Sequence, residues 1–321
     1  MKRALILTDG KAGHENQSRA FARALGLDFD VLEVKFRSKA HKAASYLLDR
    51  VGVRWIGAFR DFGGIGSLEG KGYAVVVGTG SGTFYAAKAV ARRLGAKCAV
   101  VLYPRGYSIS SFDCVLAPSF DRPHKAGNVV EIPANLVAGD SEFYAKGVEA
   151  FRARTQVEPE IAVVVGGPNK CAGMTPDWMR AQLDEIFAAP GAKVVTTSRR
   201  TPPEVEAVVD SYPWDWKLIY SRDHFNPIPA FVSLARRLCV TADSTGMISE
   251  ACTFGSAEVV VLDNLHPGPS KYRRFIDSLR AGGHVGGSRK IDLSVQFAAA
   301  RRLLGLEAAG NTTTAFKPKG E

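Results

Sequence analysis

The stretch V-T-A-D-S-T-G-M-I-S-E-A-C-T-F-G, residues 240–255, reads as the end of a buried strand followed by a tight turn and a helix. Asp243 and Ser244 are both residue types that cap a helix start, and Gly255 is typical of the position just after a helix end. Strand, turn and helix in this order form the repeating unit of parallel α/β sheets. The stretch therefore predicts the fold class and a helix start at the carboxyl edge of a sheet.

That helix start has two interpretations. The first N–H groups of a helix are unpaired and the dipole makes this end positive, so a phosphate is favoured near Ser244, Thr245 and Gly246. Glu250 lies one to two turns further along, where its carboxylate could hold a ribose diol. The other interpretation is an ordinary capped helix whose Glu250 is a surface charge.

Strand-like apolar runs alternate with helical patterns along the chain. The runs lie at residues 4–7, 29–34, 73–77, 97–102, 161–165, 193–197, 217–220, 238–241 and 259–262. Helix boundaries are indicated by Gly95, by Thr175-Pro176 and by a capping box in T-P-P-E at 201–204. This alternation is typical of parallel sheets covered by helices, so the sequence predicts an α/β fold.

A length of 321 residues favours two domains. The strand pattern lapses into a charged helix at 141–154, and a new doubly wound unit begins with I-A-V-V-V-G-G at 161–167. We therefore expect two facing Rossmann-like domains, 1–154 and 155–310, with the boundary near Arg154. The polar tail, 311–321, is predicted to be disordered.

Composition limits the classes of partner. Lys and Arg number 42 against 32 Asp and Glu, and the net charge of +10 suits a phosphate-bearing substrate, an anionic membrane surface or a nucleic acid. Nucleic acid ranks last because the basic residues are scattered and no binding module is recognisable. Five cysteines without a C-x-x-C pair suggest neither disulfides nor zinc. The N-terminus lacks a signal-peptide pattern and no 18-residue apolar run occurs, so we expect a cytoplasmic protein, at most peripheral to the inner membrane.

The loop T-D-G-K-A-G-H-E-N-Q-S, residues 8–18, follows the first strand. Gly10 and Gly13 permit a tight backbone path, and His14 falls near the start of the next helix. A neutral histidine there can accept a proton. A histidine that only caps the helix or faces solvent is the alternative.

A second glycine-rich loop, G-T-G-S-G at 78–82, also joins a strand to a helix. It is not the dinucleotide fingerprint, because Thr83 stands where the third glycine belongs. Small residues such as Gly78 and Gly80 are better explained by close approach of the backbone to a ligand or to the opposing domain.

The loop G-G-P-N-K at 166–170 opens the second half. The amides of Gly166 and Gly167 could approach a diphosphate, with Asn169 adding a donor and Lys170 a positive charge. A plain β-turn is the alternative, and the Walker A ending is absent.

Two more loops carry basic residues at strand ends. T-T-S-R-R-T-P-P-E, residues 196–204, places Ser198, Arg199 and Arg200 at a strand end before a helix. Residues 262–275 include His266, Lys271 and Arg273. These side chains suit phosphate oxygens, although solvated basic surfaces are the alternative. Five such loops at one sheet edge favour a phosphate-bearing ligand.

The motif at 240–255 resembles the donor-nucleotide motif of GT-B glycosyltransferases, particularly the enzyme that adds N-acetylglucosamine to lipid I. Together with D-G-K-A-G-H-E-N-Q-S, G-G-P-N-K and T-S-R-R-T-P it resembles the mitochondrial-fission Elm family, from the first strand to about Leu304. Bacterial members of that family are regarded as glycosyltransferases, whereas plant members act as fission adaptors.

The resemblance implies roles for individual residues. It implies that Glu250 holds the donor ribose and that His14 is the base, while the donor diphosphate is contacted by Gly166, Gly167, Asn169, Ser244 and Thr245. The chain departs from the lipid I enzyme after the motif, where H-P-G-P-S-K-Y-R-R at 266–274 replaces a glutamine pair. The donor sugar is therefore left open.

Residues 39–60 combine apolar and basic side chains. Leu47, Leu48, Val51, Trp55, Ile56 and Phe59 occur with five Lys or Arg residues, a composition that can lie in an anionic membrane interface. A core helix with a basic outer face is the alternative.

These observations together predict a GT-B-like enzyme that transfers a sugar from a nucleotide-sugar to an acceptor hydroxyl, on a lipid or a lipopolysaccharide core. The N-terminal domain would serve the acceptor and the C-terminal domain the donor. No cofactor or metal is expected, because no D-x-D cluster is present and the helix dipole and basic residues can neutralise the diphosphate. A nucleotide-sugar 2-epimerase and a non-catalytic adaptor are the alternatives.

Overall fold

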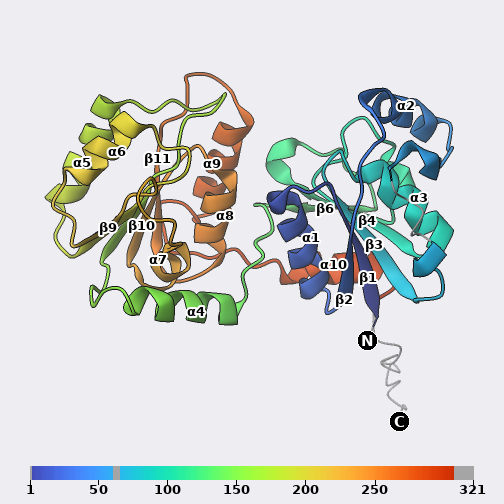
Figure 1. The fold of residues 1–321 in the computed structure, drawn as a ribbon, viewed down its shortest axis with the longest axis horizontal. Helices are drawn as coiled ribbons and strands as arrows, with labels where there is room; N and C mark the ends of the chain where they lie inside the picture. Colours follow the sequence, from blue (N-terminus) through green and yellow to red (C-terminus); the bar gives the residue numbers. More distant parts are fainter. Residues whose placement is uncertain (1, 61–65, 307–321) are drawn as a thin grey trace, which may run out of the picture.

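The computed structural model describes residues 2–60 and 66–306, which form two α/β units side by side (Figure 1). The first unit is built on a six-stranded sheet in the order β2-β1-β3-β4-β5-β6, and all its strand pairs are parallel. Its strands are β1 (Arg3–Thr8), β2 (Asp28–Glu33), β3 (Tyr73–Thr79), β4 (Lys97–Val101), β5 (Cys114–Pro118) and β6 (Val129–Ile132).

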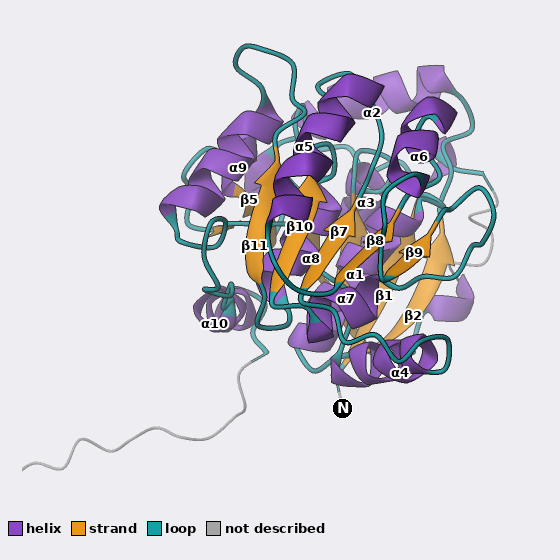
Figure 2. Cartoon of the chain, turned by 90° about the vertical axis from the view of Figure 1, so that its left-hand side faces the viewer, coloured by secondary structure: helices purple, strands orange, loops and turns teal. Residues whose placement is uncertain are grey.

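The second unit is built on a five-stranded parallel sheet in the order β11-β10-β7-β8-β9, which Figure 2 shows face on. Its strands are β7 (Ile161–Val164), β8 (Lys193–Thr196), β9 (Trp216–Leu218), β10 (Arg237–Thr241) and β11 (Glu258–Leu262). In both sheets the order reverses beside the first strand of the unit, as is usual where doubly wound sheets bind ligands.

Helices cover both faces of each sheet. The α-helices are α1 (Ala12–Ala24), α2 (Lys39–Arg50), α3 (Phe84–Leu94), α4 (Ser141–Arg152), α5 (Pro176–Ala188), α6 (Pro203–Asp210), α7 (Ile228–Leu234), α8 (Thr245–Thr253), α9 (Lys271–Ala281) and α10 (Ser294–Leu303). Short 3-10 turns include η1 (Ile56–Ala58), η3 (Ile109–Ser111) and η4 (Ser119–Asp121).

Buried apolar strands explain this layering. Val75, Val76 and Val77 of β3 are fully buried, and they alternate between two cores on opposite faces of the sheet. On one face α1 and α10 bury apolar residues, and on the other α3 does so, with α2 packed against it. In the second unit α5 and α6 cover one face, and α4, α7, α8 and α9 cover the other. This confirms the predicted α/β class with two doubly wound parallel sheets.

Nine of the strands match predicted runs, and two strands were not predicted. β5 has the sequence C-V-L-A-P and β6 has V-V-E-I. A terminal proline in β5 and a glutamate in β6 interrupt the apolar pattern, so these short strands are recognisable only from their pairing with β4 and with each other.

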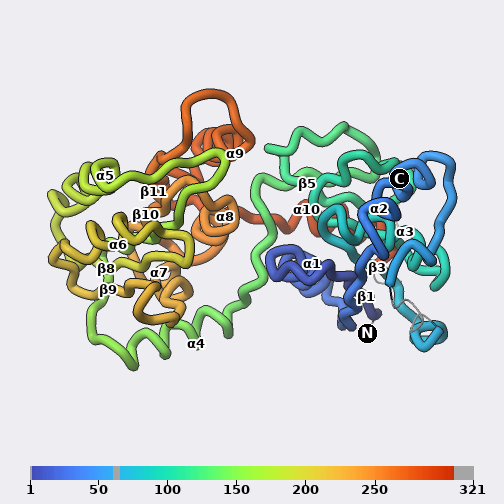
Figure 3. Tube along the Cα trace, turned by 45° about the horizontal axis from the view of Figure 1, so that its top comes forward, coloured from blue at the N-terminus to red at the C-terminus, as the bar shows by residue number. Residues whose placement is uncertain are grey.

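The chain crosses between the units twice, as Figure 3 shows in the segments that lead to α4 and to α10. α4 packs against α7, and its Phe151 belongs to the core of the second unit. α10 packs against β5 and β6, and Leu304 belongs to a core of the first unit. The packing therefore differs from the expected division at Arg154, because α4 belongs with the second sheet and α10 with the first. The predicted tail lies outside the described residues.

The units also contact each other directly. The ring of Phe120 in η4 lies 4.8 Å from that of Phe275 in α9, in an edge-on arrangement. The guanidinium of Arg274 donates to the carbonyl oxygen of Phe120 at 3.3 Å. Within residues 2–60 and 66–306, no helix combines the length and the apolar character needed to cross a bilayer.

The return of α10 can be tested by stability. Leu304, directly after α10, is 3% exposed against the first sheet, whereas Val295 in α10 is 75% exposed. Leu304→Ala should lower the free energy of unfolding by about 2–5 kcal/mol, because a buried leucine leaves a cavity, and Val295→Ala should change it by less than about 0.5 kcal/mol. Urea unfolding measures both, and equal effects would contradict the packing of α10.

Candidate active site

Asp243 joins three loops at the carboxyl edge of the second sheet. Its carboxylate, which is 0% exposed, accepts the N–H of Gly167 at 3.1 Å, the hydroxyl of Thr241 at 2.5 Å and the guanidinium of Arg200 at 2.6 Å. The backbone oxygen of Asp243 accepts the side-chain amide of Asn169 at 2.9 Å. The loops that follow β7, β8 and β10 are therefore held in one frame.

The two glycines after β7 are needed for this frame. A Cβ on Gly166 would lie 2.3 Å from the Asp243 carboxylate, and one on Gly167 would lie 2.0 Å from the carbonyl oxygen of Arg200. The N–H of Gly166 donates to Thr241 at 2.8 Å, and that of Gly167 donates to Asp243. We expected these amides to face a diphosphate, but both have partners inside the protein.

The loop after β8 also differs from expectation. Arg199 is exposed, whereas its neighbour Arg200 reaches Asp243 and also donates to the carbonyl oxygen of Gly167 at 3.1 Å. Thr201 does not cap α6, whose N-cap is Pro202. The Thr201 hydroxyl lies 2.6 Å from the carbonyl oxygen of Gly166 and accepts the N–H of Ser198 at 2.9 Å. The predicted capping box is therefore wrong, because its threonine is used to fasten the glycine loop.

The start of α8 keeps its predicted geometry. Ser244 is the N-cap, and its hydroxyl accepts the N–H of Met247 at 3.3 Å. The N–H groups of Thr245 and Gly246 have no carbonyl partner within the helix, as holds for any first turn. The Thr245 hydroxyl accepts the side-chain amide of Asn135 at 3.1 Å, so the first connection between the units is tied to this helix start. The dipole of α8 makes this position favourable for an anion.

Glu250 lies further along α8 and is partly buried. Tyr144 of α4 donates its hydroxyl to the Glu250 carboxylate at 2.9 Å. Burial raises the pKa of Glu250 above its usual value, and the hydrogen bond from Tyr144 offsets part of this rise. Burial beside this carboxylate also raises the pKa of Tyr144, so the tyrosine stays a donor. The tyrosine was missed in the sequence because it lies 106 residues away in the chain.

His14 forms the centre of a second group, in the first unit. Its Nδ1 lies 3.0 Å from the carboxylate of Asp9, and Lys11 lies 3.3 Å from the same carboxylate. Burial alone would raise the pKa of Asp9, but the neighbouring His14 and Lys11 outweigh it and hold that pKa below its usual value. Since an ionised carboxylate only accepts hydrogen bonds, Nδ1 carries the hydrogen and Nε2 is the nitrogen that can accept a proton.

The second glycine-rich loop packs directly on this pair. A Cβ on Gly80 would lie 2.3 Å from the His14 ring, and one on Gly82 would lie 2.7 Å from the Asp9 Cβ. Close approach was predicted for this loop, but towards a ligand or the opposing domain, whereas the structure brings it against His14 and Asp9 of its own unit. Asp9 was missed as a candidate, although it lies five residues before His14 in the loop that we singled out.

The remaining predicted residues lie near the carboxyl ends of strands in the two sheets, and their contacts do not assign them a role. Lys170 and Lys271 are exposed, and Lys271 is the first residue of α9. Gly10 has a φ of 80°, while Gly13 in α1 and Gly78 in β3 are parts of regular elements. The loop after β11 pairs with the glycine loop, since the N–H of His266 donates to the carbonyl oxygen of Cys171 at 2.8 Å.

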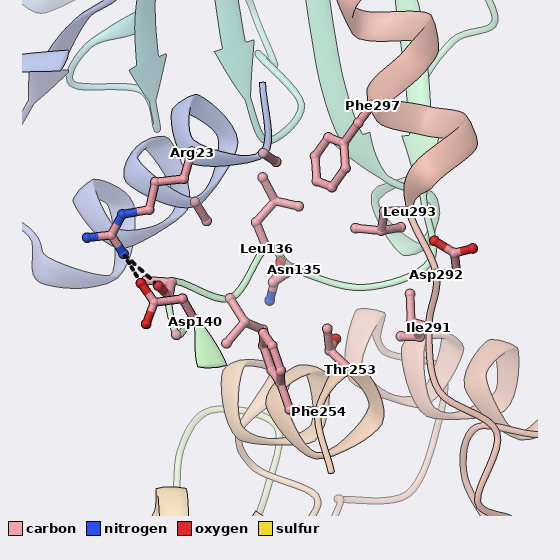
Figure 4. A pocket seen from close by; sticks show the side chains of 15 residues that line it. Arg23, Asn135, Leu136, Asp140, Thr253, Phe254, Ile291, Asp292, Leu293 and Phe297 are labelled. Atoms are coloured by element: carbon pink, nitrogen blue, oxygen red, sulfur yellow. Dashed lines mark hydrogen bonds and ion pairs between the residues drawn. The ribbon is translucent and has the colours of Figure 1, made fainter. Parts of the chain in front are cut away.

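Figure 4 shows a pocket of about 290 Å³ between the units, and none of the predicted site residues line it. Its walls come from the carboxyl end of α1 with Arg23, from Phe254 just after α8, from Phe297 of α10 and from both connections. Because α1 and α8 have their carboxyl ends here, their starts with His14 and Ser244 point away from this pocket. The pocket therefore lies beside the two connections between the units, away from the starts of α1 and α8.

The family model described as mitochondrial fission ELM1 matches residues 12–291. The chain belongs to the mitochondrial fission ELM1 family. The match includes His14 and Glu250, and it begins three residues after Asp9. A search of curated proteins found no significant match.

Solved structures show the fold of this ELM1-family chain. A Listeria monocytogenes protein provisionally assigned as a UDP-N-acetylglucosamine 2-epimerase has a TM-score of 0.54 at 12% identity, over 95% of this chain and 88% of that one. UGT89C1 of Arabidopsis thaliana, complexed with UDP, has a TM-score of 0.53 at 10% identity, over 95% and 90% of the two chains. A UGT transferase from Siraitia grosvenorii, in complex with UDP, has a TM-score of 0.50 at 10% identity, over 95% and 93%. The ELM1-family chain therefore has the GT-B fold.

The frame around Asp243 in this ELM1-family chain can be tested against an exposed pair of the same chemistry. The carboxylate of Asp243 is buried, whereas Asp263 pairs with Arg273 at 3.0 Å on the surface. Asp243→Asn should lower the free energy of unfolding by about 2 kcal/mol, because a buried, charge-assisted set of hydrogen bonds is broken. Asp263→Asn should change it by less than about 0.5 kcal/mol.

Urea unfolding of the two variants measures this difference. Equal and small losses would show that Asp243 does not hold the three loops together.

Proposed function

We propose that this chain transfers a sugar from a nucleotide-diphosphate sugar to an acceptor hydroxyl. The observation that carries the proposal is the Asp9–His14 pair, in which a carboxylate fixes one ring nitrogen and leaves the other able to take a proton. An adaptor that only binds a protein has no need of such a pair. The fold shared with UDP-bound glycosyltransferase structures supports the same class of reaction.

The donor is assigned to the second unit. The start of α8 offers the N–H groups of Thr245 and Gly246 and a positive dipole end for the diphosphate. Glu250 lies six residues beyond the cap, about 9 Å along a helix of ordinary rise, and is placed to accept hydrogen bonds from the ribose. Because the amides of Gly166 and Gly167 already have partners, we assign the glycine loop to shaping the site through Asp243.

The reaction that follows is a single displacement at the anomeric carbon. The acceptor oxygen attacks this carbon while its proton passes to Nε2 of His14, and the bond from the carbon to the diphosphate oxygen breaks. Asp9 stabilises the imidazolium that forms. The negative charge that develops on the leaving diphosphate is stabilised by the amide groups and dipole at the start of α8. The acceptor is placed on the side of the first unit, where His14 lies.

The proton acceptor can be tested in the first unit. His14→Ala should lower the rate of sugar transfer about 10²- to 10⁴-fold, the usual contribution of general base catalysis, and leave the affinity for UDP unchanged. His124→Ala is the control, because this exposed histidine lies in the same unit and its ring lies 6.3 Å from that of Tyr103. Transfer rates with a UDP-sugar measure the effect, and a wild-type rate in His14→Ala would contradict the assignment.

The donor site can be tested with UDP alone. Glu250→Ala should weaken UDP binding roughly tenfold or more, because a hydrogen bond to a charged group is lost. Glu250→Gln keeps a hydrogen-bond acceptor for Tyr144, so it separates the loss of UDP binding from the loss of packing between α4 and α8. Glu185→Ala on α5 is the control. Calorimetry measures the affinities, and unchanged affinity in both Glu250 variants would refute the donor site.

Two other functions give different results in the same assays. A nucleotide-sugar 2-epimerase, which the structural similarity to the Listeria protein makes the nearest alternative, would convert UDP-N-acetylglucosamine with no acceptor present. A non-catalytic adaptor would show no shift in melting temperature with any nucleotide or nucleotide-sugar.

A further inference from the structure

Exposed apolar side chains are concentrated in one segment of the first unit. Among the described residues, seven large apolar side chains are exposed, and four of them lie within residues 47–55. They are Leu47 at 66%, Val51 at 72%, Val53 at 44% and Trp55 at 44%. We call these four side chains the docking face.

This set differs from the one expected from the sequence. Phe59 is 1% exposed, and Leu48 and Ile56 pack against the core of the first unit. These three residues therefore belong to the protein interior, as the alternative of a core helix required. Leu47, Val51 and Trp55 remain exposed, and Val53 joins them. The segment thus buries some of its apolar side chains in the core and exposes others to solvent.

The charges around the docking face are of one sign. Residues 37–60 contain six basic side chains and a single acidic one, Asp49. The carboxylate of Asp49 is 0% exposed, and it pairs with Lys88 at 2.8 Å and with Arg54 at 3.1 Å. Within residues 37–60, all of which the structure describes, no acidic side chain is therefore exposed. Exposed apolar side chains in a stretch rich in basic residues are complementary to an anionic lipid bilayer.

The docking face is held rigidly. Lys88 of α3 is buried against Asp49 of α2 and also donates to the carbonyl oxygen of Ser108 at 2.7 Å. The N–H of Trp55 donates to the hydroxyl of Tyr85 at 2.9 Å. Burial lowers the pKa of Lys88, although the contact with Asp49 opposes this. These contacts tie α2 and the segment after it to α3.

We propose that the docking face binds an anionic bilayer, so that the acceptor hydroxyl reaching His14 belongs to a lipid-borne molecule. α2 links the two places: its Lys42 donates to the Ser81 hydroxyl at 2.9 Å, and Ser81 lies between the glycines that pack on His14 and Asp9. The nature of the acceptor rests on the proposed function, whereas docking itself does not.

Flotation with vesicles tests docking in the absence of nucleotide. The full chain should float with vesicles of phosphatidylcholine and phosphatidylglycerol, but not with phosphatidylcholine alone. Val51→Glu should reduce the bound fraction at least tenfold. Val295→Glu, the same change at an equally exposed valine of α10, should leave it unchanged.

Insertion is tested by fluorescence. Trp55 is the tryptophan of the first unit, and the other three, Trp178, Trp214 and Trp216, lie in the second. Brominated lipids should quench part of the fluorescence of the wild type and none of that of Trp55→Phe. Salt-sensitive flotation without this quenching would mean adhesion through charge alone and would overturn the proposal.

The remaining outcomes separate this proposal from the proposed function. Equal flotation of the two glutamate variants would overturn docking while leaving UDP binding untouched. A change of oligomeric state in Val51→Glu would mean that a second copy covers the face, which also overturns it. Glu250→Gln should float with the vesicles to the same extent as the wild type, so a defect in UDP binding can be distinguished from a defect in membrane binding.

Discussion

The carboxylate of Asp243 holds together the loops that follow three strands of the second sheet. It accepts hydrogen bonds from a backbone amide, a hydroxyl and a guanidinium while being shielded from water, so each of these bonds is stronger than it would be at the surface. The next residue, Ser244, caps α8, so the position of the first turn of this helix follows from the hydrogen bonds of Asp243. The start of α8, where we propose that the diphosphate binds, is therefore positioned by Asp243.

The first unit uses a comparable arrangement with different chemistry. Asp9 orients His14, and the glycines at 80 and 82 let a neighbouring loop lie flat against both side chains. In each unit an aspartate directs another group, and glycines allow the backbone to approach to within contact distance. The glycine-rich loops were predicted to approach a ligand or the opposing domain, whereas in the structure each packs against residues of its own unit.

How far the sequence predicts the structure follows from the range of the interactions. Caps and apolar runs are local signals, so β10, the Ser244 cap and the position of His14 at the start of α1 were predictable. The choice between Arg199 and Arg200 was not, because it is decided by an aspartate 43 residues away. The link from Tyr144 to Glu250 and the packing of α10 on the first sheet depend on contacts between distant segments and leave no pattern in the sequence.

The return of α10 to the first sheet has a consequence for biosynthesis. The second unit, from α4 to the connection before α10, is one uninterrupted stretch of chain, whereas the first unit is assembled from two stretches. During translation the strands β5 and β6 emerge long before α10, which covers them, so this part of the face that α1 and α10 share stays open while the entire second unit is synthesised. The second unit can thus complete its core earlier than the first, against the usual order from the N-terminus.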